Sequence, residues 1–291
     1  MTDLQVGQTA SVKRVFQQED FDRFAALSGD DNPIHVDPQF SARTRFGRTV
    51  AHGMLLFGAV GGVLGSRLPG PGTIQLEQEL MFPSPTYVGE EVTIQVEVVS
   101  VSPGKGEAEL TTIVARPDGD MGLLGRTRVR LPGAPARPMS APSETWTVEA
   151  PGTSFKGLEL QQRAETRRIF TAHDLASYAA LVGDVNPVFT DNQAARQRGF
   201  DRLIVPGSLL GALFSYLLGT ELPGRGTNYL KQRLQFPALA TVNQELTASV
   251  EVIRLRSGKQ LVNLRTLCTK PDGEIVCCGE ALVLVSDVER R

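Results

Sequence analysis

The chain has 291 residues, enough for one large domain or for two ordinary domains with separate hydrophobic cores. Its composition, 41% hydrophobic and 21% charged, is that of a globular protein, and a formal charge of −2 with no basic stripe argues against a nucleic-acid partner. No apolar run reaches the roughly 18 residues that cross a bilayer, and the polar start of the chain lacks the apolar core of an export signal. We therefore expect a cytoplasmic protein with no membrane partner.

The first half of the chain begins with a predicted helix near 21–27, followed by a polar loop at 28–37. Asp37 and Pro38 suit a helix cap and a first helical residue, so a second helix is expected from Pro38. A long apolar helix follows at about 52–67. Alternating apolar residues and a Pro-Asp-Gly turn then predict four strands, at about 73–82, 91–101, 107–116 and 122–131.

The apolar helix contains glycines at positions 53, 58, 61, 62 and 65. An interior glycine makes a helix less stable than alanine does, by roughly 0.8–1 kcal/mol. Close approach of other backbone to the helix would offset that loss. The half is therefore expected to be an α+β unit in which an antiparallel sheet wraps tightly around a buried helix.

The second half repeats the first at a constant offset. Phe24 aligns with Tyr178, giving 178 − 24 = 154, and the same offset relates Asn32-Pro33 to Asn186-Pro187 and the two "LPG" segments at Leu68 and Leu222. The register holds without a gap as far as the two "PDG" turns. We therefore expect two domains, 1–132 and 153–291, joined by a Pro/Ala-rich linker at 133–152 and placed side by side as a pseudo-twofold pair.

The three cysteines, Cys268, Cys277 and Cys278, are few and lie close together in the sequence. Their spacing fits neither a disulfide framework nor a zinc site. We therefore expect a reducing environment and no zinc site formed by these cysteines.

The polar loop "SGDDNPIHVD" places Asp30, Asn32 and His35 within six residues. One interpretation is a solvated turn without chemistry, with Asp31 exposed and Asp37 as a cap. The second copy argues for a different interpretation. It keeps the aspartate and asparagine of the loop but replaces three other residues: Ser28 by Val182, His35 by Phe189 and His52 by Pro206. This pattern indicates one working site, in the first half, and one degenerate copy.

The chemistry of these residues suits proton transfer next to a carbonyl group. An aspartate can act as a base and a histidine can give or take a proton near neutral pH. If Gly53 opens the apolar helix, its backbone N–H is unpaired and can stabilise an oxyanion. Together Asp30, His35 and Gly53 fit enolate chemistry on an acyl compound.

The stretch "FAALSGDDNPIHVDPQFSARTRFGRTVAHGML" resembles the hydratase-2 signature of the MaoC-like (R)-specific enoyl-CoA hydratases. The whole chain resembles the double-hotdog form of that family, in which each hotdog is a long helix wrapped by an antiparallel sheet. The resemblance implies reversible syn hydration of a trans-2-enoyl-CoA to the (R)-3-hydroxyacyl-CoA in fatty-acid metabolism. It implies that Asp30 and His35 activate water, that the Gly53 N–H polarises the thioester carbonyl, and that Asn32 supports them.

The resemblance implies no metal and no redox cofactor, only the coenzyme A or phosphopantetheine of the substrate. It also leads us to expect that the degenerate half makes room for a bulky or long acyl chain. Ser28 is expected to form local hydrogen bonds, and His52 is expected to pack and cap the helix rather than contact the thioester. Arg43, Arg45 and Arg48 are candidates for binding the phosphates of the substrate, the alternative being an ordinary basic surface segment.

Three other functions remain open from the sequence. The same residues suit a (3R)-hydroxyacyl thioester dehydratase of fatty-acid or polyketide synthesis, acting on coenzyme A or carrier-protein substrates. A thioesterase is a second alternative. The third is a non-catalytic subunit that binds acyl thioesters, and a homodimer of double hotdogs is the assembly considered.

Overall fold

The computed structural model describes residues 4–134 and 154–287. Most of the predicted linker 133–152 therefore lies outside the described residues. Within the described ranges, no helix has both the length and the apolarity that crossing a membrane requires.

The helices of the first half are α1 (Gln18–Ser28), α2 (Pro33–Val36), α3 (Pro38–Ala42) and α4 (Gly53–Ser66). The Asp37 carboxylate accepts hydrogen bonds from the backbone N–H groups of Gln39 and Phe40, so the predicted cap of α3 is confirmed. The four-residue helix α2 was not predicted. The side chain of Asn32 caps this helix, and a proline is its first residue. Because asparagine and proline are equally typical of turns, the sequence of the polar loop did not reveal the helix.

The strands of the first half are β1 (Thr9–Val15), β2 (Ile74–Met81), β3 (Glu91–Ser102), β4 (Glu107–Ala115) and β5 (Met121–Arg130). The four predicted strands are confirmed to within one residue at each end. The prediction of four strands per half was nevertheless wrong, because β1 is a fifth. It is an edge strand that pairs only with β3, and none of its side chains is fully buried, so it lacks the apolar alternation that reveals the others.

The second half repeats these elements. Its helices are α5 (Ala172–Val182), α6 (Pro187–Thr190), α7 (Asn192–Gln197) and α8 (Gly207–Tyr216), and a π-helical turn (Leu217–Glu221) extends α8. Its strands are β8 (Arg163–Ile169), β9 (Asn228–Gln235), β10 (Glu245–Arg256), β11 (Leu261–Thr269) and β12 (Ile275–Leu284). Two short strands, β6 (Ser154–Phe155) and β7 (Leu158–Glu159), precede β8, and a 3₁₀ turn (Ser257–Lys259) precedes β11. The offset holds in space: 207 − 53 = 154 for the central helices and 228 − 74 = 154 for β2 and β9.

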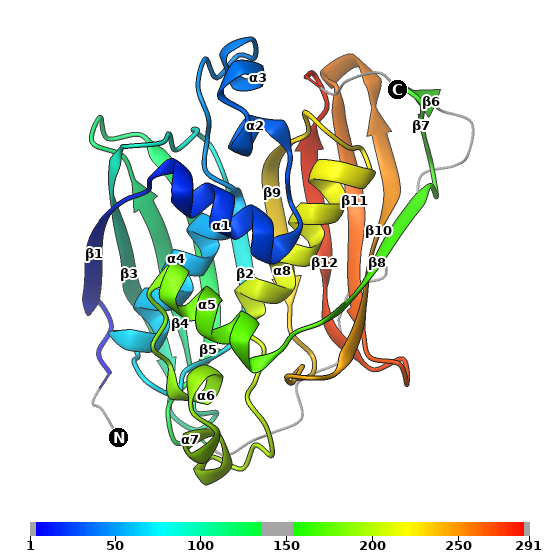
Figure 1. The fold of residues 1–291 in the computed structure, drawn as a ribbon. Helices are drawn as coiled ribbons and strands as arrows, with labels where there is room; N and C mark the ends of the chain where they lie inside the picture. Colours follow the sequence, from blue (N-terminus) through cyan, green and yellow to red (C-terminus); the bar gives the residue numbers. More distant parts are fainter. Residues whose placement is uncertain (1–3, 135–153, 288–291) are drawn as a thin grey trace.

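The two halves form one antiparallel sheet of ten strands, ordered β1-β3-β4-β5-β2-β9-β12-β11-β10-β8. They join where β2 pairs with β9, and at that seam Glu79 lies opposite Arg233. Because 79 + 154 = 233, the pair relates equivalent positions, and the pseudo-twofold axis passes between them. Figure 1 shows the helices on one face of the sheet, with α4 and α8 side by side against it. The predicted α+β double hotdog is thus confirmed.

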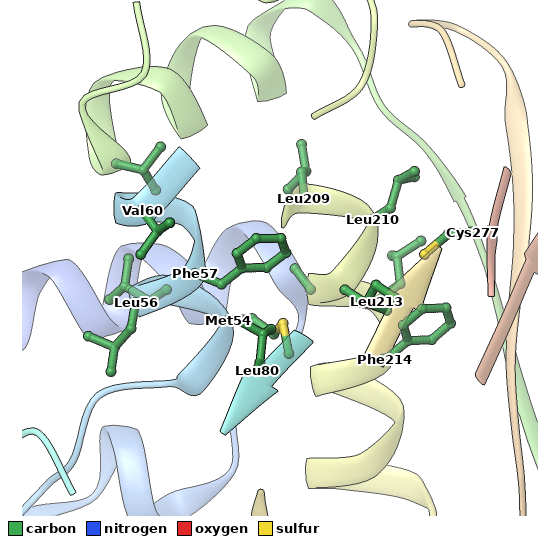
Figure 2. Packing of buried hydrophobic residues seen from close by; sticks show 14 of the residues in the cluster. Met54, Leu56, Phe57, Val60, Leu80, Leu209, Leu210, Leu213, Phe214 and Cys277 are labelled. Atoms are coloured by element: carbon green, nitrogen blue, oxygen red, sulfur yellow. The ribbon is translucent and has the colours of Figure 1, made fainter. Parts of the chain in front are cut away.

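The central helices share one hydrophobic core. Met54 and Phe57 on α4 lie on the side of that helix that faces α8 (Figure 2), and a Cβ at Gly211 of α8 would lie 3.0 Å from the Met54 sulfur and 3.8 Å from the Phe57 ring. Both side chains are fully buried. The connected cluster of buried residues extends from Phe16 to Val285. The interface between the halves is therefore part of the hydrophobic core. Burial of each such side chain contributes roughly 1.5–3 kcal/mol, so this interface stabilises both halves.

Each half also holds the polar loop of the other. The Asn32 side chain donates to the carbonyl oxygen of Thr227 (3.1 Å), and the equivalent Asn186 donates to that of Thr73 (2.8 Å). Both asparagines are 1% exposed. The asparagine is therefore retained in both copies because it ties the halves together, which is a structural role.

The glycines of α4 allow this close contact. A side chain at Gly62 would place its Cβ 2.5 Å from the carbonyl oxygen of Val182, the last residue of α5. The neighbouring backbone is thus a helix of the other half, rather than the wrapping sheet expected from the sequence. Gly61 differs, because a Cβ at that position would lie 3.5 Å from its nearest neighbour, the Ser208 hydroxyl.

These adjacent glycines should respond oppositely to alanine. Gly62→Ala is expected to lower the free energy of unfolding by about 1–3 kcal/mol, because the backbone carbonyl of Val182 cannot move aside easily. Gly61→Ala is expected to raise it by up to about 1 kcal/mol, because alanine favours the helix and finds space. Urea unfolding of both variants measures the difference, and equal effects would contradict the packing described here.

Candidate active site

A cavity of about 180 Å³ lies at the junction of the two halves. The first half contributes Asp30, His35 and Gly53 to its wall, and the second half contributes Ser215, Leu218 and Tyr229. The three predicted catalytic residues therefore meet at one cavity. The second half completes that cavity, which the sequence comparison of the halves did not predict.

Asp30 is 1% exposed and sits against the end of the second half's central helix. Its carboxylate accepts hydrogen bonds from the Ser215 hydroxyl (2.6 Å) and from the backbone N–H of Asn32 (3.2 Å). A Cβ at Gly219 would lie 2.5 Å from the carboxylate, so only glycine leaves room for it. Burial raises the pKa of Asp30 to about 7, and the two hydrogen bonds act in the opposite direction.

His35 lies on α2 and is held as a neutral imidazole. Its Nδ1 is 2.7 Å from the carbonyl oxygen of Val50. A carbonyl only accepts, so we assign the proton to Nδ1, which leaves Nε2 with a free lone pair. Burial lowers the pKa of His35 to about 4, and the ring is therefore uncharged at neutral pH.

His52, the residue before α4, stacks on His35 with the ring centroids 3.8 Å apart. Its Nε2 is 2.9 Å from the carbonyl oxygen of Asp30, and burial lowers its pKa well below the ordinary value. His52 is completely buried behind the cavity wall. It packs against the ring of His35 and supports the backbone of Asp30, as predicted, but its side chain makes no hydrogen bond that caps α4, so the predicted capping role is wrong.

Asp30, His35 and His52 bring potential ligand atoms within 4.8 Å of one another, which raises the question of a metal site. A metal bound to imidazole lies in the plane of the ring, about 2 Å from nitrogen. The two histidine rings are stacked at 26° to each other, and one nitrogen of each ring lies within hydrogen-bond distance of a backbone carbonyl oxygen. The expectation of no metal stays a prediction.

Gly53 is the first residue of α4, so its N–H has no acceptor within the helix and lies at the positive end of the helix dipole. A Cβ at this position would lie 2.7 Å from the ring of Phe82. A Cβ at Gly207 would lie at the same distance from the ring of Phe236 in the second half. Packing therefore requires glycine in both halves, and in the first half this glycine lines the cavity.

The structure distinguishes the three candidate arginines. Arg45 lines the cavity. Arg48 pairs with Glu90 at 2.8 Å and lies over the Tyr87 ring, so its guanidinium is already engaged. Arg43 is exposed at the end of α3 and is outside the cavity wall. Arg45 alone of the three remains a candidate for binding substrate phosphate.

Ser28 forms the local hydrogen bonds expected of it. Its hydroxyl donates to the carbonyl oxygen of Phe24 (2.7 Å) and accepts from the backbone N–H of Asp30 (3.1 Å). These bonds fix the start of the loop that carries Asp30.

Ser215 is the functional residue that the sequence comparison missed. Its equivalent in the first half is Gly61, since 215 − 154 = 61. Comparing the halves for residues lost from the second copy reveals His35 and His52. Comparing them also for polar residues gained by the second copy would have revealed Ser215.

The degenerate site, defined by the residues equivalent to the cavity wall, is filled with apolar side chains. Phe189 replaces His35, Ile74 replaces Asn228 and Ile204 replaces Val50; with Val188 they form a separate buried cluster. Asp184 remains buried there, and burial raises its pKa to about 7. Gly61 stands where a serine would donate to it.

Asp184 should make the protein less stable as pH rises. Its pKa is higher in the folded chain than its ordinary 3.8, so the folded state binds more protons between about pH 4 and 7. The free energy of unfolding therefore falls across that interval, on the order of 1 kcal/mol per pH unit for one such group. Asp184→Asn is expected to make the fall shallower, as measured by urea unfolding at several pH values; an unchanged slope would contradict the shift.

Comparison with known proteins places both halves in one family. The family model described as "MaoC like domain" matches residues 3–116 and 155–270. An (R)-specific enoyl-CoA hydratase of Aeromonas caviae is 45% identical over 129 residues, which are 44% of this chain and 96% of that protein. A 3-hydroxybutyryl-CoA dehydratase of Methylorubrum extorquens is 39% identical over 130 residues, which are 45% of this chain and 82% of that protein.

A solved structure agrees with the fold over nearly the whole chain. A conserved hypothetical protein of Mycobacterium tuberculosis, described as having a double hotdog fold, superposes with a TM-score of 0.75. The match covers 97% of each chain at 17% identity, so it supports the architecture alone.

Proposed function

This chain belongs to the MaoC-like domain family, and we propose from that membership and from its site that it catalyses the reversible syn hydration of trans-2-enoyl-CoA to (R)-3-hydroxyacyl-CoA in fatty-acid metabolism. It is a hydro-lyase. The observation that carries the proposal is the convergence on one cavity of a buried carboxylate with a pKa of about 7, a neutral imidazole and a helix-terminal amide. No cofactor beyond the thioester itself is part of the proposal.

The Gly53 N–H supplies the electrophilic half of the reaction. It donates a hydrogen bond to the thioester carbonyl oxygen, and this bond strengthens as negative charge builds up on that oxygen. The cavity wall next to Gly53 includes the apolar side chains of Leu56 and Phe82, which exclude water from the enolate.

Asp30 supplies the proton transfer. As a carboxylate it takes one proton from a water molecule while the water oxygen bonds to C3, and the electrons of the double bond move to form the enolate. The resulting carboxylic acid returns that proton to C2 on the same face, which gives syn addition and restores the carboxylate. A pKa of about 7 suits both steps, because near neutral pH much of the group is ionised and the carboxylate is a stronger base than an ordinary one.

His35 orients the water. Its Nδ1 proton is held by the Val50 carbonyl, so Nε2 can accept a hydrogen bond from the same water that Asp30 deprotonates. Because burial keeps the ring neutral, it does not compete with Asp30 as the proton store.

Asp30→Asn tests the central assignment. Loss of the base should lower kcat for crotonyl-CoA hydration by about 10²–10⁴-fold, the usual scale of acid–base catalysis. Asp184→Asn is the matched control, because it makes the same change at the equivalent buried position of the degenerate site and should keep near-normal turnover. Near-normal turnover of Asp30→Asn would disprove the assignment.

Ser215→Ala tests the contribution of the second half to the site. The Ser215 hydrogen bond lowers the pKa of Asp30, so its removal should raise that pKa further. Since the base must be ionised, the acid limb of kcat against pH should move to higher pH, with the activity loss larger at pH 6 than at pH 8.5. Ser208→Ala, on the same helix but beside the degenerate site, should leave the limb in place.

The same residues run the reaction in reverse, so dehydration of a (3R)-hydroxyacyl thioester is the second candidate, supported by the dehydratase named among the relatives. Turnover on coenzyme A and carrier-protein thioesters distinguishes the physiological substrate.

Measuring free thiol in the same assays tests for thioesterase activity, and complete inactivity on enoyl-CoAs would favour a binding subunit. Light scattering tests whether two double hotdogs assemble into a homodimer.

A further inference from the structure

Arg45, the arginine of the cavity wall, has a counter-ion from the far end of the chain. Its Nε lies 3.8 Å from a carboxylate oxygen of Asp287, and its guanidinium lies 4.9 Å from the centroid of the Phe46 ring. The Arg45 side chain is 46% exposed and that of Asp287 is 24% exposed, so the pair stands at the solvent-accessible side of the site.

The segment that carries Asp287 is fixed in place by specific contacts. We call residues 285–287, which follow β12, the C-terminal strap. Lys156 donates through Nζ to the backbone carbonyls of Val285 (2.6 Å) and Ser286 (3.0 Å). Asn228, a buried residue of the cavity wall, donates through Nδ2 to the Asp287 carboxylate (3.0 Å).

The arrangement exists only at the working site. The positions equivalent to Arg45, Asn228 and Asp287 are Gly199 (45 + 154), Ile74 (228 − 154) and Gly133 (287 − 154). The degenerate half therefore has none of these three residues at the equivalent positions, and its neighbouring Arg198 lies against the backbone of Gly72 instead of a carboxylate. An ion pair with no role at the site would not be expected to occur only in the half that carries the catalytic residues.

We propose that Arg45 binds a phosphate of the group that carries the acyl thioester, and that Asp287 is the exchangeable counter-ion which this phosphate displaces. This inference rests on the proposed function, because the enoyl thioester enters with a pantetheine arm that bears phosphate in coenzyme A and in carrier proteins alike. Asp287 holds Arg45 in place in the free protein and competes with the incoming anion.

The relative strengths of the two contacts favour the exchange. The Arg45–Asp287 contact is a single long N–O approach between partly exposed groups, a type of pair that contributes little to stability. A guanidinium binds phosphate through two parallel charge-assisted hydrogen bonds, which are shorter and stronger. Asp287 therefore weakens the binding of anionic substrates without blocking it.

The test compares three crotonyl thioesters: those of coenzyme A, of 4′-phosphopantetheine and of neutral pantetheine. Arg45→Gln should raise KM for the coenzyme A thioester by about tenfold, and Asp287→Asn should lower it by about two- to fivefold, both with kcat unchanged. In the double variant the Asp287→Asn effect should disappear, because the residue acts through Arg45. With the neutral pantetheine thioester neither variant should change KM.

The phosphopantetheine thioester identifies which phosphate is bound. Effects on both charged substrates support recognition of the phosphate common to coenzyme A and carriers, and effects on the coenzyme A thioester alone support recognition of its nucleotide phosphates. Asp272→Asn is the control for net charge, because it removes one carboxylate in the exposed turn at the other end of β12 and should leave KM unchanged.

Two results would overturn the inference. One is an equal change in KM for charged and neutral thioesters, and the other is no change in any of them. Both presuppose wild-type protein that hydrates crotonyl-CoA; absence of that activity would instead refute the proposed function.

Discussion

The two halves depend on one reciprocal contact, in which the polar loop of each half packs against the central helix of the other, and the remaining features of the molecule follow from this contact. Asp30 lies against Gly219, and Asp184 lies against Gly65, each at a distance that a Cβ atom would not allow. The asparagine two residues later fastens each loop to the opposite half. Because these contacts obey the pseudo-twofold symmetry, both copies of the motif must keep them for the halves to fit together, whether or not a copy does chemistry.

The same burial creates the chemistry. Removal from water raises the pKa of both aspartates to about 7, so a property useful to a catalyst arises from a contact needed for assembly. What separates the two is the environment. Asp30 has Ser215 as a donor, His35 beside it and a cavity in front, whereas Asp184 faces Gly61 and an apolar cluster that includes Phe189. The half without the two site histidines still supplies a serine and part of the cavity wall to the other site.

The cavity also bears on the acyl chain. Its volume of about 180 Å³ is below the roughly 300–1,000 Å³ of sites that enclose drug-sized ligands, and the second half retains a full central helix packed tightly against α4 (Figure 2). The expectation that the degenerate half makes room for a bulky or long acyl chain stays a prediction. What this half contributes to the site is polar groups and the C-terminal strap.

The elements and the internal symmetry could be read from the sequence. Local signals were enough for the cap at Asp37, for four strands of the first half to within one residue, and for the loop that holds Asp30 and His35, because each signal lies within a few residues of chain. The residues that complete the site became visible only in three dimensions. Ser215 lies 215 − 30 = 185 residues from Asp30, and Asp287 lies 287 − 45 = 242 residues from Arg45. Contacts between residues so far apart produce no periodic pattern in the sequence. The pKa values also could not be predicted from it, because they follow from burial, which exists only once the two halves have packed together.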